Sequence, residues 1–160
     1  RVADQVRQDL PQPAGVAELR YGNSGKWVAD TGPDRYRRGL YVHFQRTTPF
    51  PMLMNFDSPD SNTACSRRGR SNTPLQALNL MNDEAFHEAA QALSKRIEKE
   101  APAGKRIDFA FRAALGRAPT DAERERLAAF QDEQARLGAT DAWTNVSRVI
   151  LNLDEFVTRE

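Results

Sequence analysis

Apolar residues recur every three or four positions along the second half of the chain, the spacing of an amphipathic helix. This pattern predicts helices over 74–81, 83–100, 106–115, 121–137 and 141–156, the first two as one kinked helix or as two. The side chains expected to face the core are Ala85, Phe86, Ala89, Ala90, Leu93, Ile97, Ile107, Ala110, Phe111, Ala114, Leu115, Leu127, Ala129, Phe130, Leu137, Trp143, Val146, Val149, Ile150, Leu153 and Phe156.

Helix-end signals agree with this spacing. Thr73 with Gln76, and Thr120 with Glu123, have the three-residue separation of a capping box. Asp141 is a third expected N-cap. The glycine at 116 follows a predicted helix, where a left-handed C-cap is common.

The first half has weaker periodicity. Residues 1–33 are rich in glycine and proline and predict an extended, loop-rich arm, with 34–160 as the helical domain. Residues 34–47 fit a helix or a strand, and we favour the helix. Residues 48–72 predict a long, packed connection without secondary structure of its own.

These patterns together predict a mainly α protein: an irregular bundle of about four or five helices with an ordered, loop-rich N-terminal third. The 160 residues, of which 39% are hydrophobic, suffice for one core. No run of 18 apolar residues occurs, so no membrane span is expected, and no signal-peptide pattern is visible.

Charge is uneven along the chain although the formal net charge is only +1. Residues 35–70 hold seven arginines, no lysine and two aspartates, for a net charge of +5, whereas 71–160 carry −3. Arginine favours planar, bidentate contacts with carboxylate or phosphate, so this composition indicates specific contacts. With no basic face interleaved with aromatic residues, nucleic acid is not an expected partner.

Arginines lead directly into the helix expected at Pro74, and two hypotheses remain open for them. They bind an anion with help from the helix N-terminus, or they form a structural clamp with carboxylates such as Asp57, Asp60, Asp83, Asp154 or Glu155. The candidate residues for either role are Arg37, Arg38, Arg67, Arg68, Arg70, Asn72 and Thr73.

Evidence for catalysis is weak. Asp57, Asp60 and His43 are the candidate catalytic groups, yet two aspartates three apart in a proline-containing turn are equally typical of a turn. His43 and His87 lack a partner at metal-ligand spacing, so no metal is expected. Cys65 is a small buried residue or, beside Arg67, a reactive thiol; alone it excludes an internal disulfide and a haem-attachment motif.

A series of motifs resembles one family. They are Tyr36-Arg37-Arg38-Gly39-Leu40-Tyr41, Arg46-Thr47, Phe56-Asp57-Ser58-Pro59-Asp60, Cys65-Ser66-Arg67-Arg68, Arg70-Ser71-Asn72-Thr73-Pro74-Leu75-Gln76-Ala77-Leu78, Leu80-Met81-Asn82-Asp83 and Leu151-Asn152-Leu153-Asp154-Glu155-Phe156. Over residues 15–160 the chain resembles the C-terminal part of the planctomycete-type domain of unknown function. That domain occurs in large exported proteins that often carry a cytochrome c domain.

The resemblance implies no established activity. It implies an extracytoplasmic location, periplasmic or secreted, and a parent protein whose other domains are partners. Haem c would be carried by another of those domains, and no cofactor is expected in this chain. We expect a structural or interaction module organised by an Arg/Asp network. The alternative is part of an oxidoreductase or carbohydrate-active enzyme with an arginine-rich pocket for a small anion or carbohydrate.

Overall fold

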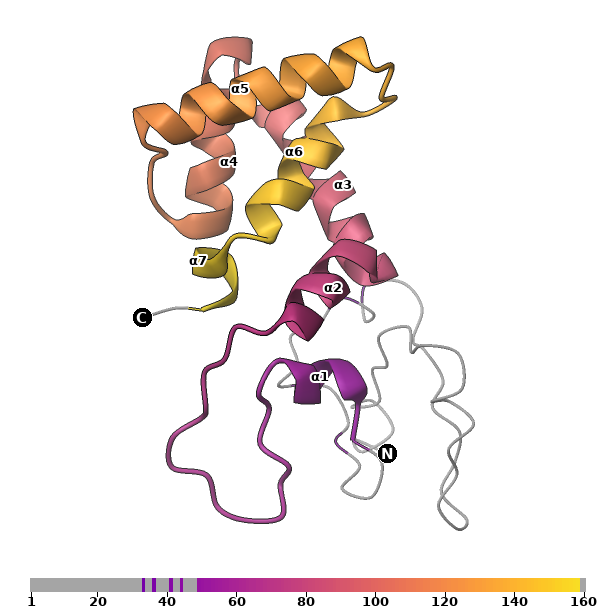
Figure 1. Cartoon of the computed structure of the whole chain (residues 1–160), viewed down its shortest axis with the longest axis vertical. Coiled ribbons are helices and arrows are strands. Elements are labelled where there is room, and N and C mark those ends of the chain that lie inside the picture. Colours follow the sequence, from indigo (N-terminus) through magenta and orange to yellow (C-terminus); the bar gives the residue numbers. More distant parts are fainter. Residues whose placement is uncertain (1–32, 34–35, 37–40, 42–43, 45–48, 159–160) are drawn as a thin grey trace. The chain divides into compact units, whose positions relative to one another are not determined.

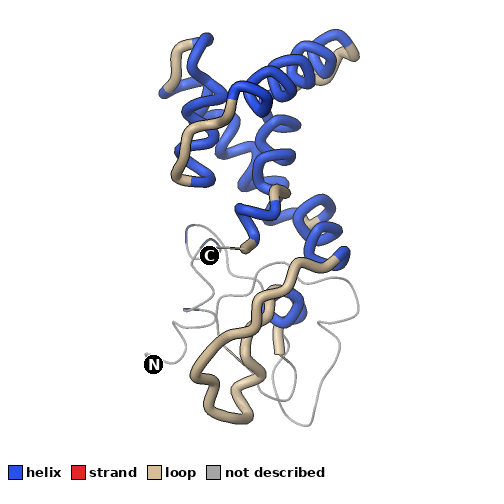
Figure 2. Tube along the Cα trace, turned by 60° about the vertical axis from the view of Figure 1, so that its left-hand side comes forward, coloured by secondary structure: helices blue, strands red, loops and turns tan. Residues whose placement is uncertain are grey.

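The computed structural model describes residues 33, 36, 41, 44 and 49–158. The chain divides into two compact units, residues 1–71 and residues 72–160. The expected arm at 1–33 and helix at 34–47 fall almost entirely outside the described residues. Every regular element among the described residues is helical, so the prediction of a mainly α protein is confirmed (Figures 1 and 2).

The first unit contains one described α-helix, α1 (Pro51–Asn55), inside the stretch expected to lack secondary structure. That expectation is wrong for these five residues. Pro51 occupies the first turn, where its fixed φ suits a helix and its missing N–H costs nothing. Pro51 thus starts a short helix, and the irregular part of the connection begins after it.

The described residues of the second unit form six α-helices and one short 3₁₀ turn. They are α2 (Pro74–Asn82), α3 (Glu84–Glu100), η4 (Ala103–Lys105), α4 (Arg106–Leu115), α5 (Asp121–Arg136), α6 (Ala142–Leu151) and α7 (Asp154–Val157). With α1, the described residues hold seven α-helices, more than the four or five expected.

Local capping explains most of these boundaries. Thr73 and Thr120 both form the predicted capping boxes, and Asp141 accepts from the backbone N–H of Thr144 at 2.9 Å. Asp83 accepts from the N–H of Ala85 at 2.9 Å, so α2 and α3 are separate helices. Gly116 ends α4 with φ 77°, a conformation that glycine adopts without steric cost.

The core lies where α3, α4, α5 and α6 meet. Its buried side chains are Ile97, Ala110, Phe111, Leu127, Val146 and Ile150, all of them expected. The contact between α3 and α6 is the most extensive in the unit, and both helices carry buried residues of small volume, Ala90 and Ser94 on α3 and Thr144 and Ser147 on α6. Figure 1 shows α6 crossing α3 beneath α5.

Four residues expected in the core are exposed: Ala89, Ala129, Leu137 and Val149. Leu137 is 74% exposed because it is the C-cap of α5, beyond the last turn that packs on the core. The apolar spacing alone does not show where a packed face ends.

Candidate functional site

A long loop follows α1 and holds three of the predicted arginines. We call residues 57–71 the arginine loop. The backbone N–H of Ser71 donates to Asp57 Oδ2 at 2.7 Å, and Ser71 Oγ donates to Asp57 Oδ1 at 2.8 Å. The loop therefore closes on itself at its base, as Ω-loops do. Asp57 has φ 58°, a left-handed conformation that aspartate tolerates better than most residues.

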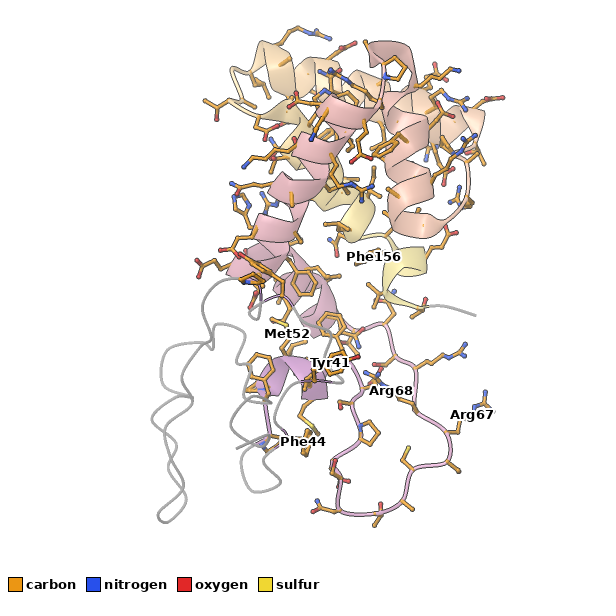
Figure 3. All side chains as sticks on the ribbon, turned by 180° about the vertical axis from the view of Figure 1, so that it is seen from behind. Tyr41, Phe44, Met52, Arg67, Arg68 and Phe156 are labelled. Carbon is orange, nitrogen blue, oxygen red and sulfur yellow. The ribbon has the colours of Figure 1, made fainter. Side chains whose placement is uncertain are left out.

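Arg68 strengthens this closure from within the arginine loop. Its Nε donates to the carbonyl oxygen of Asp57 at 2.7 Å, and its Nη2 donates to the carbonyl of Phe56. Figure 3 shows the Arg68 side chain turned back across the loop. Its guanidinium thus satisfies main-chain acceptors instead of the carboxylates expected in the clamp hypothesis.

Arg67 and Arg70 differ from Arg68. Both are exposed, and neither has a hydrogen bond or ion pair with another residue of the described part of the chain. Figure 3 shows Arg67 directed away from the loop. The arginine loop therefore carries two cationic side chains that no described carboxylate neutralises.

The other polar residues of the loop form local contacts. Asn62 donates to Asp60 from its backbone N–H at 3.0 Å and from Nδ2 at 3.1 Å. These bonds, the backbone one first, hold the pKa of the exposed Asp60 carboxyl below its usual value. Cys65 is exposed, and its Sγ donates to the carbonyl of Arg67 at 3.3 Å. Of the two hypotheses for this cysteine the buried one is wrong, because Cys65 lies in a stretch, 60–70, that is exposed throughout.

Asn72 and Thr73 contact the second unit, to which they belong. Asn72 Nδ2 donates to Asp154 Oδ1, at the start of α7. Thr73 Oγ1 accepts from the N–H of Gln76 at 3.3 Å, and the N–H of Thr73 donates to Gln76 Oε1 at 3.0 Å. Thr73 therefore caps α2, and Asn72 joins the start of α2 to α7 by donating its side-chain amide to a carboxylate.

The other candidate residues have no shared site among the described residues. Arg37, Arg38 and His43 lie outside the described residues. His87 is on the exposed side of α3, with its Nε2 3.1 Å from Gln91 Nε2. No group of three or more potential metal-ligating side chains occurs within the described residues.

Sequence reasoning missed the densest ion-pair network of the described residues, which is centred on Arg117. Its Nη2 lies 2.7 Å from Glu123 Oε1 and 2.7 Å from Glu155 Oε2, and its Nε lies 2.7 Å from Glu155 Oε1. The guanidinium also stacks 5.2 Å from the ring centroid of Phe111. Arg117 thus joins the α4–α5 turn, the first turn of α5 and α7.

The electrostatics of this network follow from its hydrogen bonds. Bonds from Arg117, then from the backbone of Thr120, lower the pKa of Glu123 to about 2. Glu155 also has a lowered pKa because Arg117 donates to it. These carboxylates are stabilised as anions at neutral pH, so neither resembles a general acid, which needs a raised pKa.

A second charge pair and a capping aspartate complete the polar framework. Arg124 Nη2 lies 2.9 Å from Asp108 Oδ1 and joins α5 to α4. Ser94 Oγ donates to Asp141 Oδ1 at 3.1 Å, linking α3 to the cap of α6. Partial burial raises the pKa of Asp141, but the bonds from Thr144 and Ser94 outweigh it and leave the pKa lowered.

Surface cavities lie in the second unit. The largest of those described, about 650 Å³, is lined by residues of the α4 C-terminus with Glu155 and Thr158. One of about 440 Å³ lies between the α3 C-terminus and Arg124, and one of about 270 Å³ lies among Met81, Phe130 and Val149. None of these three is lined by Asp57 or Asp60.

The described residues form a helical domain that is preceded along the chain by an arginine-bearing Ω-loop. The family model PSD1, "Protein of unknown function (DUF1553)", matches residues 2–131, and the chain belongs to that family. No curated protein and no solved structure matches the chain. Among the described helices, none has the length and apolar composition that crossing a bilayer requires.

Proposed function

We propose that this chain is a non-catalytic interaction module that docks onto an anionic partner through its arginine loop. The observation that supports this most directly is the state of Arg67 and Arg70. Both are exposed and lack a described carboxylate partner, on a loop that is closed at its base by Asp57, Arg68 and Ser71. A preorganised loop loses less conformational entropy on binding than a flexible loop does.

The chemistry of the loop supports a partner that is anionic. Within 57–71 the charged residues are three arginines and two aspartates, and both carboxylates accept hydrogen bonds inside the loop. Free guanidinium groups form bidentate contacts with carboxylate, sulfate or phosphate oxygens. An acidic surface on another domain of the parent protein is the partner that we propose.

The experiment measures binding of the full chain to an acidic probe, a poly-glutamate peptide, by calorimetry at low and physiological salt. Replacing both Arg67 and Arg70 by alanine is expected to weaken binding at least tenfold. The matched control is the double substitution of Arg126 and Arg136, two exposed arginines on α5 that also lack a described partner. An equal loss in both variants would mean that only net charge matters, and undetectable binding of the wild type would overturn the proposal.

The enzyme alternative has less support. Asp57 accepts hydrogen bonds from Ser71 through both carboxylate oxygens, and the pKa of Asp60 is lowered. A carboxyl acting as a proton donor at neutral pH would need a raised pKa. His43 lies outside the described residues, so its catalytic role stays a hypothesis from the sequence, and binding of a carbohydrate stays a hypothesis from the family resemblance.

We further propose that the parent protein is exported and that another of its domains carries haem c. Both proposals rest on the family resemblance alone. Cell fractionation of the producing organism, with immunodetection of this chain, tests the location. Recovery in the cytoplasmic fraction would contradict it.

A further inference from the structure

The cavity of about 440 Å³ at the end of α3 has a lining that is rich in charged side chains. It lies wholly within the second unit, between the end of α3, the turn η4, α4 and α5. We call it the Lys105 cavity. Its volume falls within the range of about 300–1000 Å³ that is usual for small-molecule sites. The charged lining residues are Glu100, Lys105, Asp108, Arg112 and Arg124.

Both carboxylates of the Lys105 cavity already have an arginine partner. Glu100 accepts from Nε and Nη2 of Arg96 at 3.1 and 3.2 Å. Asp108 accepts from Nη2 and Nε of Arg124 at 2.9 and 3.4 Å. In each pair the two carboxylate oxygens face one planar guanidinium, which is the bidentate arrangement that suits both groups. The negative charge of the lining is therefore compensated within the second unit.

Two cations of the cavity have no such partner. The side chains of Lys105 and Arg112 are exposed and form no hydrogen bond or ion pair with the described part of the chain. Hydrogen bonds from Arg124 are the main cause of the lowered pKa of Asp108, and the charge of Arg112 contributes least to it. Asp108 therefore leaves the guanidinium of Arg112 available to a ligand.

The helix α4 places these two cations on one side. Lys105 is the N-cap of α4, and Arg112 follows it by seven residues, which is about two helical turns. Both line the same cavity, together with Pro102 and the half-buried ring of Phe109. The cavity thus combines two free cationic groups with an apolar wall.

The chemistry of these groups points to one class of ligand. A guanidinium binds two oxygens of a phosphate at once, and an ammonium group adds a compact charge. A phosphate monoester carries a charge of about −1.5 to −2 near neutral pH, which matches two cations better than a single carboxylate does. We propose that the Lys105 cavity binds a small phosphate monoester, with its phosphate held by Lys105 and Arg112 and its apolar body against Phe109 and Pro102. This site is separate from the arginine loop, which belongs to the first unit.

Titration of the isotope-labelled full chain with phenyl phosphate, followed through the NMR signals of the backbone amides, tests this proposal. We expect a dissociation constant of about 0.1–1 mM, with the largest shift changes in residues 101–112. Inorganic phosphate should bind at least about threefold more weakly, because it leaves the apolar wall uncovered. The double variant Arg67→Ala, Arg70→Ala should retain the shift changes in residues 101–112, because the arginine loop is a different site.

The double variant Lys105→Gln, Arg112→Gln is expected to weaken the binding of phenyl phosphate at least about tenfold. The matched control is Arg126→Gln, Arg136→Gln, which removes the same charge from the exposed side of α5 and should bind like wild type. The amide spectrum of each variant checks that it folds. If the first double variant does not fold, Lys105→Gln alone is expected to weaken binding about threefold.

Four results would overturn the proposal. The first is a wild type without shift changes at about 10 mM phenyl phosphate. The second is a set of largest changes that lies outside residues 101–112. The third is an equal loss of binding in the control variant, or unchanged binding after the substitution of Lys105, because net charge alone would then account for the affinity. The fourth is inorganic phosphate that binds as tightly as phenyl phosphate, which would exclude a role for the apolar wall and hence an organic ligand.

Discussion

Among single residues, two buried serines, one on α3 and one on α6, have opposite roles. Ser94 and Ser147 are both fully buried. Ser94 Oγ donates to Asp141 at 3.1 Å, whereas Ser147 Oγ has no hydrogen-bond partner among the described residues. A buried polar group without a partner costs roughly 1–3 kcal/mol, so Ser147→Ala is expected to raise the free energy of unfolding by up to about 1 kcal/mol.

Ser94→Ala is the matched comparison for Ser147→Ala. It also removes a buried hydroxyl, but it leaves the carboxylate of Asp141 with one donor fewer, so a loss of about 1 kcal/mol is expected. Urea unfolding of the two variants measures both changes. Destabilisation by Ser147→Ala as large as that by Ser94→Ala would contradict the prediction.

Contacts between residues that are close in sequence can be predicted, and contacts across an irregular loop cannot. The capping boxes predicted at Thr73 and Thr120 are confirmed, because their partners lie three residues away and the pattern is local. The bonds of Arg68 to the carbonyls of Phe56 and Asp57 instead cross most of an irregular loop. No periodicity encodes such a contact. The sequence therefore indicates that an arginine of this loop has a partner, but it does not identify the partner.

At the scale of elements, the Arg117 network predicts a dependence of stability on pH. The folded-state pKa of Glu123 is about 2, below its ordinary value of 4.5, so its anion stabilises the fold. This contribution is complete above about pH 4.5 and is lost as the pH falls towards 2, because the unfolded chain takes up the proton first. Stability should therefore fall in that window.

Glu123→Gln isolates this contribution, because glutamine also completes a capping box but carries no charge. The variant is expected to lose less stability than wild type between pH 4.5 and 2. Urea midpoints measured across this pH window test the prediction. The other carboxyl groups with a lowered pKa, such as Asp108 and Glu155, are present in both proteins. An equal change of the urea midpoint with pH in the two proteins would therefore contradict the prediction.

Element boundaries are harder to predict where the apolar spacing runs through a break. The spacing predicts one helix over 141–156, but α6 ends at Leu151 and α7 begins at Asp154. Between them Leu153 is extended, with φ −72° and ψ 142°, while its side chain still packs against the core. The periodic pattern persists across the interruption, so it cannot reveal the interruption.

At the scale of the whole molecule, the core of the second unit follows from the sequence and the proposed site does not. All six buried residues of the core cluster are among those expected, because helical spacing determines which face is buried. The proposed site depends on which arginines form hydrogen bonds or ion pairs within the chain. Those contacts depend on the path of the irregular loop, and composition alone does not determine this path.

The division at Ser71 and Asn72 predicts how the protein responds to trypsin. Residues 60–70 are exposed throughout and lie outside helices, whereas most basic residues of the second unit lie on helices whose backbone must open before cleavage. Among residues 49–158, the first cuts are therefore expected after Arg67, Arg68 or Arg70. They should release a fragment beginning between Arg68 and Ser71 that stays resistant to trypsin and helical, because the core cluster lies entirely within it.

Mass spectrometry of a digestion time course identifies the cuts, and a variant with all three arginines replaced by glutamine should resist them. Early cleavage within α3 or α5 would show that the second unit does not persist on its own.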